Sequence, residues 1–347
     1  MKKKNTIKKL LSVILSAATV FSLLTLPAHA IIPGEDAYQE ESHIIHYDCI
    51  TGEAERVDLP DTAIYQNITT HSFLSEQELQ HAEENAGLQA IIGEDERVKI
   101  YNPNVGQYSG IVLIIKIIDT DDDGIEDDFT VGTGFMVSEN VMVTALHCLS
   151  MYQGNYAIME TRIYHGIAVA HADYSEGNTL EMLDSLPDNF NRLASIDYDE
   201  RYFSSAISNT ERSTYDWCVT TLQNSHNGYY FNCAVATSSL IGQTLNITGY
   251  PQINHFLDSY ETFYMYQGAG QVESGGFSPT SFPILADALH GQSGSPVHNA
   301  NYAYGIFVKD YDHTTDLVDP GDRSYNFCRG FTSEVIYTIN QVIEANQ

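Results

Sequence analysis

The segment Gly291-Gln292-Ser293-Gly294-Ser295, followed by Pro296, combines glycines with small hydroxyl and amide side chains. Glycine and proline disfavour a helix interior, and so little apolar surface cannot hold a strand together. The segment therefore presents Ser293 on permissive backbone that another molecule could approach closely. A serine hydroxyl is a weak nucleophile at neutral pH unless an adjacent base takes its proton. Ser293 is thus either part of a polar turn or a nucleophile that requires a base.

The candidate base is His147, one of thirteen histidines. It follows the apolar run VMVTAL (141–146), which would hold an imidazole rigidly at the end of a strand. Asp216, at the start of the hydrophobic run DWCVTTL (216–222), is the candidate carboxylate that orients the base and stabilises its charged form. Taken singly, His147 could be a core histidine, Asp216 a strand-start cap and Ser293 a turn residue. Their joint occurrence favours catalysis.

The order of these residues along the chain is His147, Asp216, Ser293. This is the order of the chymotrypsin-type triad, and it differs from the subtilisin and α/β-hydrolase orders. An α/β-hydrolase elbow would also require glycine at position 295, where this chain has serine.

The elements that must position these residues are mostly strands. Five segments have the composition of strands bounded by glycine and polar turns: 110–118, 132–146, 216–222, 243–250 and 302–308. Residues 333–347 have helical spacing, with Val335, Ile336, Ile339, Val342 and Ile343 on one face. Many short strands and one closing helix predict an all-β barrel or sandwich.

Residues 1–30 have the features of a secretory signal peptide: five lysines, a mainly apolar stretch and the small-x-small sequence Ala28-His29-Ala30. No later stretch is long and apolar enough to cross a bilayer, so we expect a secreted, extracellular protein. Residues 31–89 differ in composition from residues 90–347, because they hold thirteen acidic residues and one arginine. They contain one predicted helix, starting near Ser75 with a capping box to Glu78.

The chain is strongly acidic, with a formal net charge of −30 that becomes −35 when the leader's five lysines are removed. This argues against nucleic-acid binding, which requires a basic face. The charge could attract cationic peptides or only keep the protein soluble. Five cysteines without a CxxC pair argue against zinc. If Cys49 lies in a removed segment, the other four allow three disulfide connectivities.

Several segments resemble trypsin-like serine proteases. TALHC (144–148) resembles the TAAHC sequence of that family, and GQSGSP (291–296) resembles its GDSGGP. From about Ala90 to the end, three quarters of the chain is most similar to the bacterial secreted glutamyl-endopeptidase branch. The matching segments are AIIGEDER (90–97), RYF (201–203), YDW (215–217), TGYP (248–251) and RGFTSEVIYTINQVI (329–343).

This resemblance implies two perpendicular six-stranded β-barrels of chymotrypsin type with a C-terminal helix, and the triad in the cleft between them. Residues 31–89 would be a small propeptide and 90–347 the protease domain. The backbone N–H groups of Gly291 and Ser293 would form the oxyanion hole. Gln292 stands where trypsin-like enzymes carry the aspartate that pairs with the freed N-terminus, so we expect that switch to be absent.

The substrate-binding positions depart from the glutamyl-endopeptidase pattern. Phe307 stands where that branch has a carboxylate-reading histidine, and Ala288 where it has a hydroxyl residue. Asp287, six residues before Ser293, occupies the position at the base of the trypsin S1 pocket and would favour a basic P1 residue over glutamate. His290 could neutralise Asp287.

The acidic segment DTDDDGIEDD (119–128) matches the first half of a calcium loop. Asp119, Asp121 and Asp123 would supply oxygens, with Asp127 in place of the missing glutamate at loop position twelve. The alternative is a solvated hairpin tip between two strands.

We therefore predict a secreted, monomeric serine endopeptidase that acts on peptides or proteins, requires no cofactor, and binds neither nucleic acid nor membrane. A non-catalytic peptide- or protein-binding member of the same fold, and an esterase with the same triad, are the alternatives. The one metal whose binding the sequence suggests is a structural calcium ion.

Overall fold

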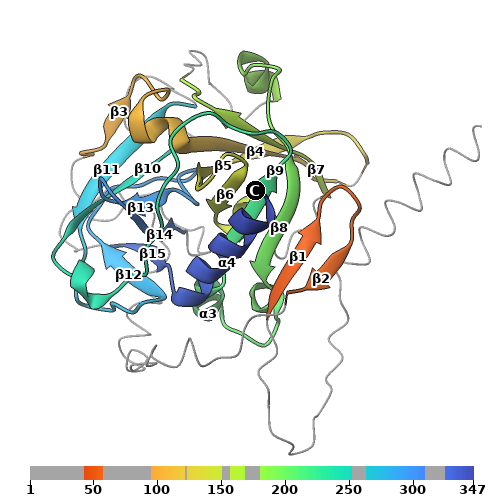
Figure 1. The fold of residues 1–347 in the computed structure, drawn as a ribbon. Coiled ribbons are helices and arrows are strands. Elements are labelled where there is room, and N and C mark those ends of the chain that lie inside the picture. The colour runs from red at the N-terminus through yellow and green to blue at the C-terminus, as the bar shows by residue number, and fades with distance from the viewer. Residues whose placement is uncertain are drawn as a thin grey trace, which may run out of the picture.

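The structure is a computed structural model that describes residues 43–57, 95–121, 123–150, 157–168, 180–251, 263–308 and 325–347. The expected signal peptide and the helix expected near Ser75 lie outside these residues. The described part is mostly β-structure, arranged as two antiparallel sheets (Figure 1).

The first sheet contains eight strands, two of which come from the segment before residue 58. In spatial order they are β2 (Ala54–Arg56), β1 (Ile44–Asp48), β8 (Leu193–Asp199), β9 (Cys218–Leu222), β6 (Val141–Thr144), β5 (Asp128–Met136), β4 (Ile111–Asp119) and β7 (Ala157–His165). Backbone hydrogen bonds of 2.8 and 3.0 Å between Ile163 and Asn191 join β7 to the residues that precede β8. The strands from β8 to β7 therefore close into a six-stranded barrel.

The second sheet contains seven described strands. In spatial order they are β12 (Ser281–Ile284), β15 (Asn326–Gly330), β14 (Ala303–Phe307), β13 (Pro296–His298), β10 (Thr244–Gly249), β11 (Met265–Gln271) and β3 (Val98–Ile100). A bridge between Val272 and Ile284 joins the end of β11 to β12, which closes a second six-stranded barrel and leaves β3 outside it. The predicted pair of six-stranded barrels is thus confirmed, with β1, β2 and β3 as additional strands.

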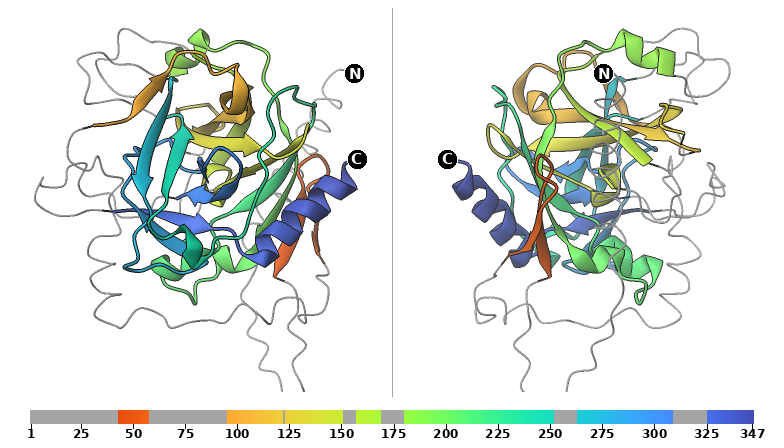
Figure 2. Two further views of the ribbon diagram at one scale, coloured as in Figure 1. Left: turned by 60° about the vertical axis from the view of Figure 1, so that its left-hand side comes forward. Right: turned by 90° about the vertical axis from the view of Figure 1, so that its right-hand side faces the viewer.

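Short helices connect the strands, and one longer helix ends the chain. They are η2 (Gly106–Gly110), η3 (Leu146–Cys148), η4 (Leu180–Ser185), η5 (Glu200–Phe203), α3 (Asn209–Thr214), η6 (Ser238–Leu240) and α4 (Ser333–Ala345). The predicted C-terminal helix is α4, which begins after the N-cap Thr332 and buries Val335, Ile339 and Val342. It packs against β9 and β6, and Figure 2 shows it beside the hairpin formed by β1 and β2.

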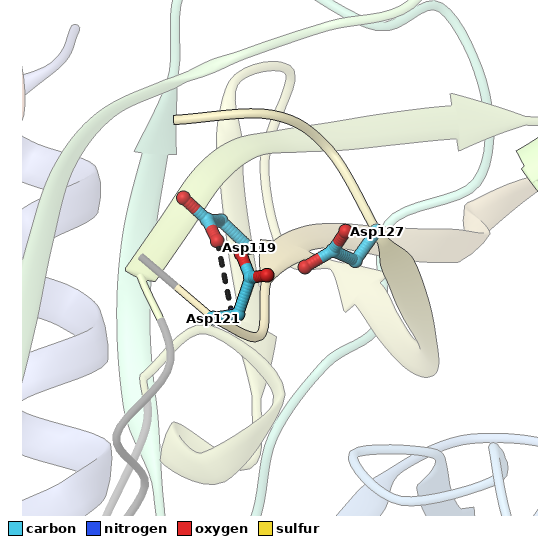
Figure 3. Close-up of side chains that lie close together, drawn as sticks. All are labelled: Asp119, Asp121 and Asp127. Atoms are coloured by element: carbon cyan, nitrogen blue, oxygen red, sulfur yellow. Dashed lines mark hydrogen bonds between the residues drawn. The ribbon is translucent and has the colours of Figure 1, made fainter. Parts of the chain in front are cut away.

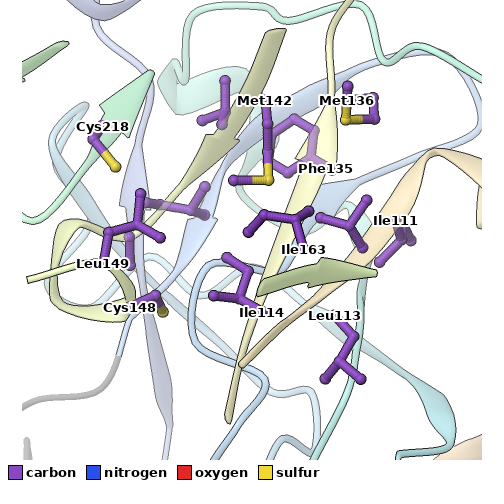
Figure 4. Packing of buried hydrophobic residues seen from close by; sticks show 14 of the residues in the cluster. Ile111, Leu113, Ile114, Phe135, Met136, Met142, Cys148, Leu149, Ile163 and Cys218 are labelled. Atoms are coloured by element: carbon purple, nitrogen blue, oxygen red, sulfur yellow. The ribbon is translucent and has the colours of Figure 1, made fainter. Parts of the chain in front are cut away.

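The larger hydrophobic core lies mainly inside the first barrel, where strands β4, β5 and β6 contribute fully buried aliphatic side chains (Figure 4). Every residue of β4 is buried, which explains its nearly unbroken apolar sequence. A smaller core cluster fills the second barrel and includes Phe282, Ile284 and Phe307. The segment between His147 and Asp216 supplies β7 and β8, so part of its length builds the first barrel.

All five cysteines fall within the described residues, and each is a free thiol. None of the disulfide connectivities that the sequence allows is therefore formed. None of the helices in the described ranges has both the length and the apolar character that a membrane crossing requires.

Candidate active site

Strand pairing brings His147 and Asp216 to the same end of the first barrel. β6 and β9 are antiparallel, with Thr144 opposite Cys218. Residue 147 lies just after the end of β6 and residue 216 just before the start of β9, so the two side chains meet beyond the paired strands. η3 carries His147 between the buried residues Leu146 and Cys148, which anchor the turn in the core.

Asp216 contacts His147 through both of its carboxylate oxygens. Oδ2 of Asp216 lies 2.6 Å from Nδ1 of His147, and Oδ1 accepts a hydrogen bond of 2.9 Å from the backbone N–H of His147. The side chain of Asp216 is 2% exposed and that of His147 is 18% exposed. These contacts fix the imidazole with Nδ1–H toward the carboxylate, which leaves Nε2 as the nitrogen that can accept a proton.

The pKa of His147 is raised well above its ordinary value. Burial is the largest single effect and lowers this pKa, but the negative charge of Asp216, its hydrogen bond to the ring and the adjacent Cys148 together outweigh burial. The pair therefore stabilises the imidazolium form, as a general base requires once it has taken a proton.

Lys116, the single cation within the apolar strand β4, supports the turn that carries His147. Its Nζ donates hydrogen bonds of 2.9 Å to the carbonyl of His147 and 3.0 Å to the carbonyl of Ser150. Burial lowers the pKa of Lys116 to about 8. A buried ammonium group needs such partners, because leaving it unpaired would be costly.

The serine loop, residues 287–295, lies between the two sheets. The carbonyl of Ser293 accepts hydrogen bonds from the backbone N–H of Thr133 on β5 (2.8 Å) and from Sγ of Cys148 (3.3 Å). On the other side, the N–H of Gly294 donates to the carbonyl of Phe307 on β14 at 2.7 Å. The main chain of Ser293 is thus bonded to the residue that directly follows His147.

Two glycines allow the backbone conformation of the serine loop. Gly291 and Gly294 have φ values of +94° and +82°, in the left-handed region that side chains other than glycine rarely adopt. A Cβ atom at Gly294 would also collide with the carbonyl of Thr133 and the hydroxyl of Thr144. The hydroxyl of Thr133 donates to the carbonyl of Gly291 at 2.9 Å, so Thr133 of β5 holds the loop both at Gly291 and at the carbonyl of Ser293.

The predicted substrate-binding residues have different environments. Ala288 and Phe307 are buried in the core cluster of the second barrel, whereas His290 is exposed. Asp287 is 6% exposed, and its Oδ2 accepts a hydrogen bond of 2.8 Å from the backbone N–H of Glu96. The carboxylate of Asp287 is therefore engaged with the segment that precedes β3.

That N-terminal segment, residues 95–97, makes a second contact with the serine loop. Nη1 of Arg97 donates a hydrogen bond of 3.2 Å to Oε1 of Gln292, and the same oxygen accepts from the N–H of Leu289 at 2.9 Å. Asp95 holds the Arg97 guanidinium with two hydrogen bonds of 2.8 and 2.9 Å. The residue just before Ser293 is thus tied to the start of the protease-like segment, although position 292 carries no aspartate.

Three of the four predicted calcium ligands lie together where β4 ends and the loop to β5 begins. One carboxylate oxygen from each of Asp119, Asp121 and Asp127 lies within 4.8 Å of the others (Figure 3). Asp123 is not part of this group and accepts a hydrogen bond of 2.8 Å from the N–H of Ile125. The charge of Asp123, followed by burial and the charge of Asp127, raises the pKa of Asp121.

Sequence analysis did not identify Lys116, Thr133 or Arg97 as parts of the site. Lys116 could have been found, because a cation inside an apolar strand needs a buried partner. Thr133 and Arg97 give no such signal, since a threonine on a strand and an arginine near an exposed segment are both common. Their roles depend on contacts with residues more than 150 positions away.

Comparisons with known proteins concern the fold. No protein-family model and no curated protein matches the chain. Among solved structures, the chain is similar to a Glu endopeptidase in complex with MPD, with 17% sequence identity and a TM-score of 0.50 over 73% of this chain and 99% of that chain. This likeness shows that the chain has the chymotrypsin-type fold, and it confirms the predicted fold class.

Two further proteases match with lower scores. The Rv3671c protease from M. tuberculosis, in its active form, has 14% identity and a TM-score of 0.39 over 67% of this chain and 80% of that chain. Neuropsin, a serine protease expressed in the limbic system of mouse brain, has 14% identity and a TM-score of 0.42 over 71% of this chain and 99% of that chain.

Proposed function

We propose that this protein is a secreted serine endopeptidase with a His147–Asp216–Ser293 triad. The observation that carries the proposal is the position of the serine loop. The main chain of Ser293 is bonded to Cys148, next to a histidine that is held by a buried carboxylate at 2.6 Å. Three separate segments of the chain thus supply a nucleophile (Ser293), a base (His147) and a group that orients the base (Asp216). Acyl transfer requires these three groups close together.

In the proposed reaction, Oγ of Ser293 attacks the carbonyl carbon of the scissile bond while Nε2 of His147 accepts the hydroxyl proton. His147 then gives this proton to the leaving amine, and Asp216 stays ionised and holds Nδ1–H throughout. The N–H groups of Gly291 and Ser293 stabilise the oxyanion, each donor contributing roughly 10²–10³ in rate. Water then hydrolyses the acyl-enzyme with the same base.

The remaining parts of the proposal concern processing and substrate. A leader (1–30) would be removed, the pro-segment (31–89) would be cut from the protease domain (90–347), and a monomer without cofactor would act on peptides or proteins. We propose that a basic P1 residue is favoured over glutamate. Phe307 replaces the histidine that would bind a glutamate carboxylate, and Ala288 replaces a hydroxyl residue. The strong acidity of the chain also favours basic substrates.

The experiment compares Ser293→Ala with Ser295→Ala. Ser295 is a matched control, because it lies two residues away and its buried hydroxyl has no hydrogen-bond partner among the described residues. Ser293→Ala should lose labelling by a fluorophosphonate probe and lower kcat by about 10⁶-fold, with unchanged circular dichroism. Ser295→Ala should retain labelling and most of the activity. A wild-type protein that is folded but neither labelled nor active would support a non-catalytic peptide-binding protein instead.

A further inference from the structure

The hairpin formed by β1 and β2, residues 43–57, belongs by sequence to the segment expected to be removed, yet it forms part of the first sheet. β1 pairs antiparallel with β8 over five residue pairs, from Ile44 opposite Asp199 to Asp48 opposite Ser195. β2 then pairs with the outer side of β1. The hairpin therefore covers the edge that β8 would otherwise present to solvent.

Backbone hydrogen bonds extend this pairing beyond both ends of β1. The N–H of Glu200 donates to the carbonyl of His43 at 2.8 Å, and the N–H of Cys49 donates to the carbonyl of Ala194 at 2.9 Å. A strand edge without such partners would expose a row of unpaired N–H and C=O groups. The observed pairing is the geometry by which extended peptides add to a sheet.

Side-chain burial anchors the hairpin in the main core. Ile44 is 0% exposed and belongs to the same core cluster as the strands of the first barrel, and Val57 packs against that cluster. By contrast, Ile50 at the hairpin tip is 70% exposed. One face of the hairpin thus packs into the core of the first barrel, whereas its tip is exposed.

Basic and acidic side chains pair across the same interface. Nδ1 of His46 lies 3.0 Å from Oδ1 of Asp197, which is a buried residue of β8. Glu200 lies 2.8 Å from Nη2 of Arg56 and 3.3 Å from Nδ1 of His43. The basic side chains of the hairpin therefore face acidic groups that β8 and η5 would otherwise leave without these partners.

We infer that residues 43–57 stay bound to the protease domain as a strand pair after the chain is cut between residues 58 and 94. The edge of β8 is then a binding surface for an added antiparallel strand, and the active protein consists of two pieces. This inference does not depend on the proposed catalytic activity, because it concerns the sheet edge and needs only a cut in the connecting segment.

The test uses the full chain carrying Ser293→Ala, which prevents self-digestion, with a recognition sequence for a site-specific protease inserted between residues 58 and 94. After cleavage, native gel filtration and intact-mass measurement should find the fragment that contains the hairpin co-eluting with the larger piece at 1:1. Separation of the fragment would overturn the inference, whether or not the larger piece stays folded.

Two variants locate the interaction. Ile44→Asp should release the fragment after cleavage, whereas Ile50→Asp places the same charge at the exposed tip and should leave co-elution unchanged. If Ile44→Asp does not fold, hydrogen exchange on the cleaved parent protein decides the question. Protection of the amides of residues 193–199 should match that of the uncut chain, and protection lost on cleavage would contradict a retained strand.

Discussion

Asp216 controls the proton of His147, because its carboxylate holds both the ring and the backbone of that residue. Burial lowers the pKa of His147, but the charge of Asp216, its hydrogen bond to the ring and the adjacent Cys148 together raise this pKa well above its ordinary value. In the proposed mechanism His147 acts as a base only when it is neutral, so we expect the acid limb of kcat/KM to have its midpoint above pH 6.5. By linkage, the same raised pKa stabilises the fold below the unfolded-state value, and this stability is lost as pH rises through the folded-state value.

Asp216→Asn should move that acid limb to lower pH, because the imidazolium loses its charged partner. It should also lower kcat by about 10⁴-fold, since asparagine can hold the wrong tautomer. The measurement is the pH profile of kcat/KM, with Asp184→Asn, at an exposed position, as a control for the lost charge. An unchanged midpoint in Asp216→Asn would contradict the assigned coupling.

We propose that Lys116 positions His147, because its ammonium group donates hydrogen bonds to the carbonyls of His147 and Ser150. Lys116→Met keeps the length of the side chain but removes the donors. We expect kcat to fall about 10²-fold with little change in KM, since small misplacements of a catalytic group are costly.

The pH profile distinguishes this role from a purely structural one. With a pKa of about 8, Lys116 loses its charge in the folded protein above that pH, and its hydrogen bonds weaken. Wild-type kcat should therefore fall above pH 8, and this limb should be absent in Lys116→Met. Stability should change in the opposite direction: the folded state binds fewer protons than the unfolded state between about 8 and 10.5, so the free energy of unfolding rises there. Parallel loss of stability and activity above pH 8 would refute the assignment.

At the scale of elements, the sequence predicted the strands whose composition is apolar and bounded by turns. The predicted segments 110–118 and 243–250 correspond to β4 and β10, and the predicted helix corresponds to α4. In β8, buried and half-exposed positions alternate, and the buried ones are Ser195, Asp197 and Asp199. Because this buried face is polar, the sequence of β8 shows no alternating hydrophobic pattern. β1 was missed for a related reason: it is short, and its stability comes from pairing with β8 rather than from its own sequence.

The candidate site divides in the same way. The proposed triad could be put forward from the sequence because chemistry requires particular residue types, and these occur beside recognisable strands; the structure shows the contact between His147 and Asp216. The supports of the serine loop could not be predicted, because Thr133 and Arg97 act through contacts that exist only after the two barrels and the N-terminal segment have come together. Local patterns identify reactive groups better than they identify the residues that hold them.

Calcium binding at the loop between β4 and β5 remains a prediction. Asp119, Asp121 and Asp127 bring three carboxylates together, and a cation would relieve their repulsion. Millimolar calcium should raise the melting temperature by a few degrees relative to chelator, because a ligand of the folded state stabilises it. Asp121→Asn should abolish this rise, whereas Glu126→Gln, at an exposed position in the same loop, should keep it. Equal melting temperatures with calcium and with chelator would end the hypothesis.

At the scale of the whole molecule, the proposed active site joins elements that no single barrel contains. The first barrel supplies His147 and Asp216, and the serine loop leads into β13 of the second barrel. Hydrogen bonds from Thr133 on one side and to Phe307 on the other clamp the loop between them. Relative movement of the barrels would thus separate nucleophile from base, so we infer that the contacts of the serine loop with both sheets are a condition of activity.

The overall charge bears on substrate preference. The protease domain, residues 90–347, has a formal net charge of −23, so its surface should concentrate cationic peptides near the site. Salt should weaken this effect, because the Debye length is about 10 Å at 0.1 M. On matched peptides with Arg, Glu or Phe at P1, kcat/KM should be highest for Arg. The advantage of Arg over Glu should shrink as ionic strength rises, while Phe should change little. A preference for Glu at low salt would contradict this expectation.

Asp287→Asn separates this general attraction from a specific charge in the S1 pocket. The carboxylate of Asp287 is buried and accepts the N–H of Glu96 at 2.8 Å, so its removal should loosen the N-terminal segment that supports the serine loop. We therefore expect kcat/KM to fall by a similar factor, about tenfold, for the Arg, Glu and Phe substrates, as a shared loss of positioning would require. Asp188→Asn, which removes the same charge from an exposed position, should leave all three values near those of wild type. If only the Arg substrate loses kcat/KM, Asp287 instead reads the P1 side chain directly, because a buried carboxylate that pairs with the substrate acts on cationic side chains alone.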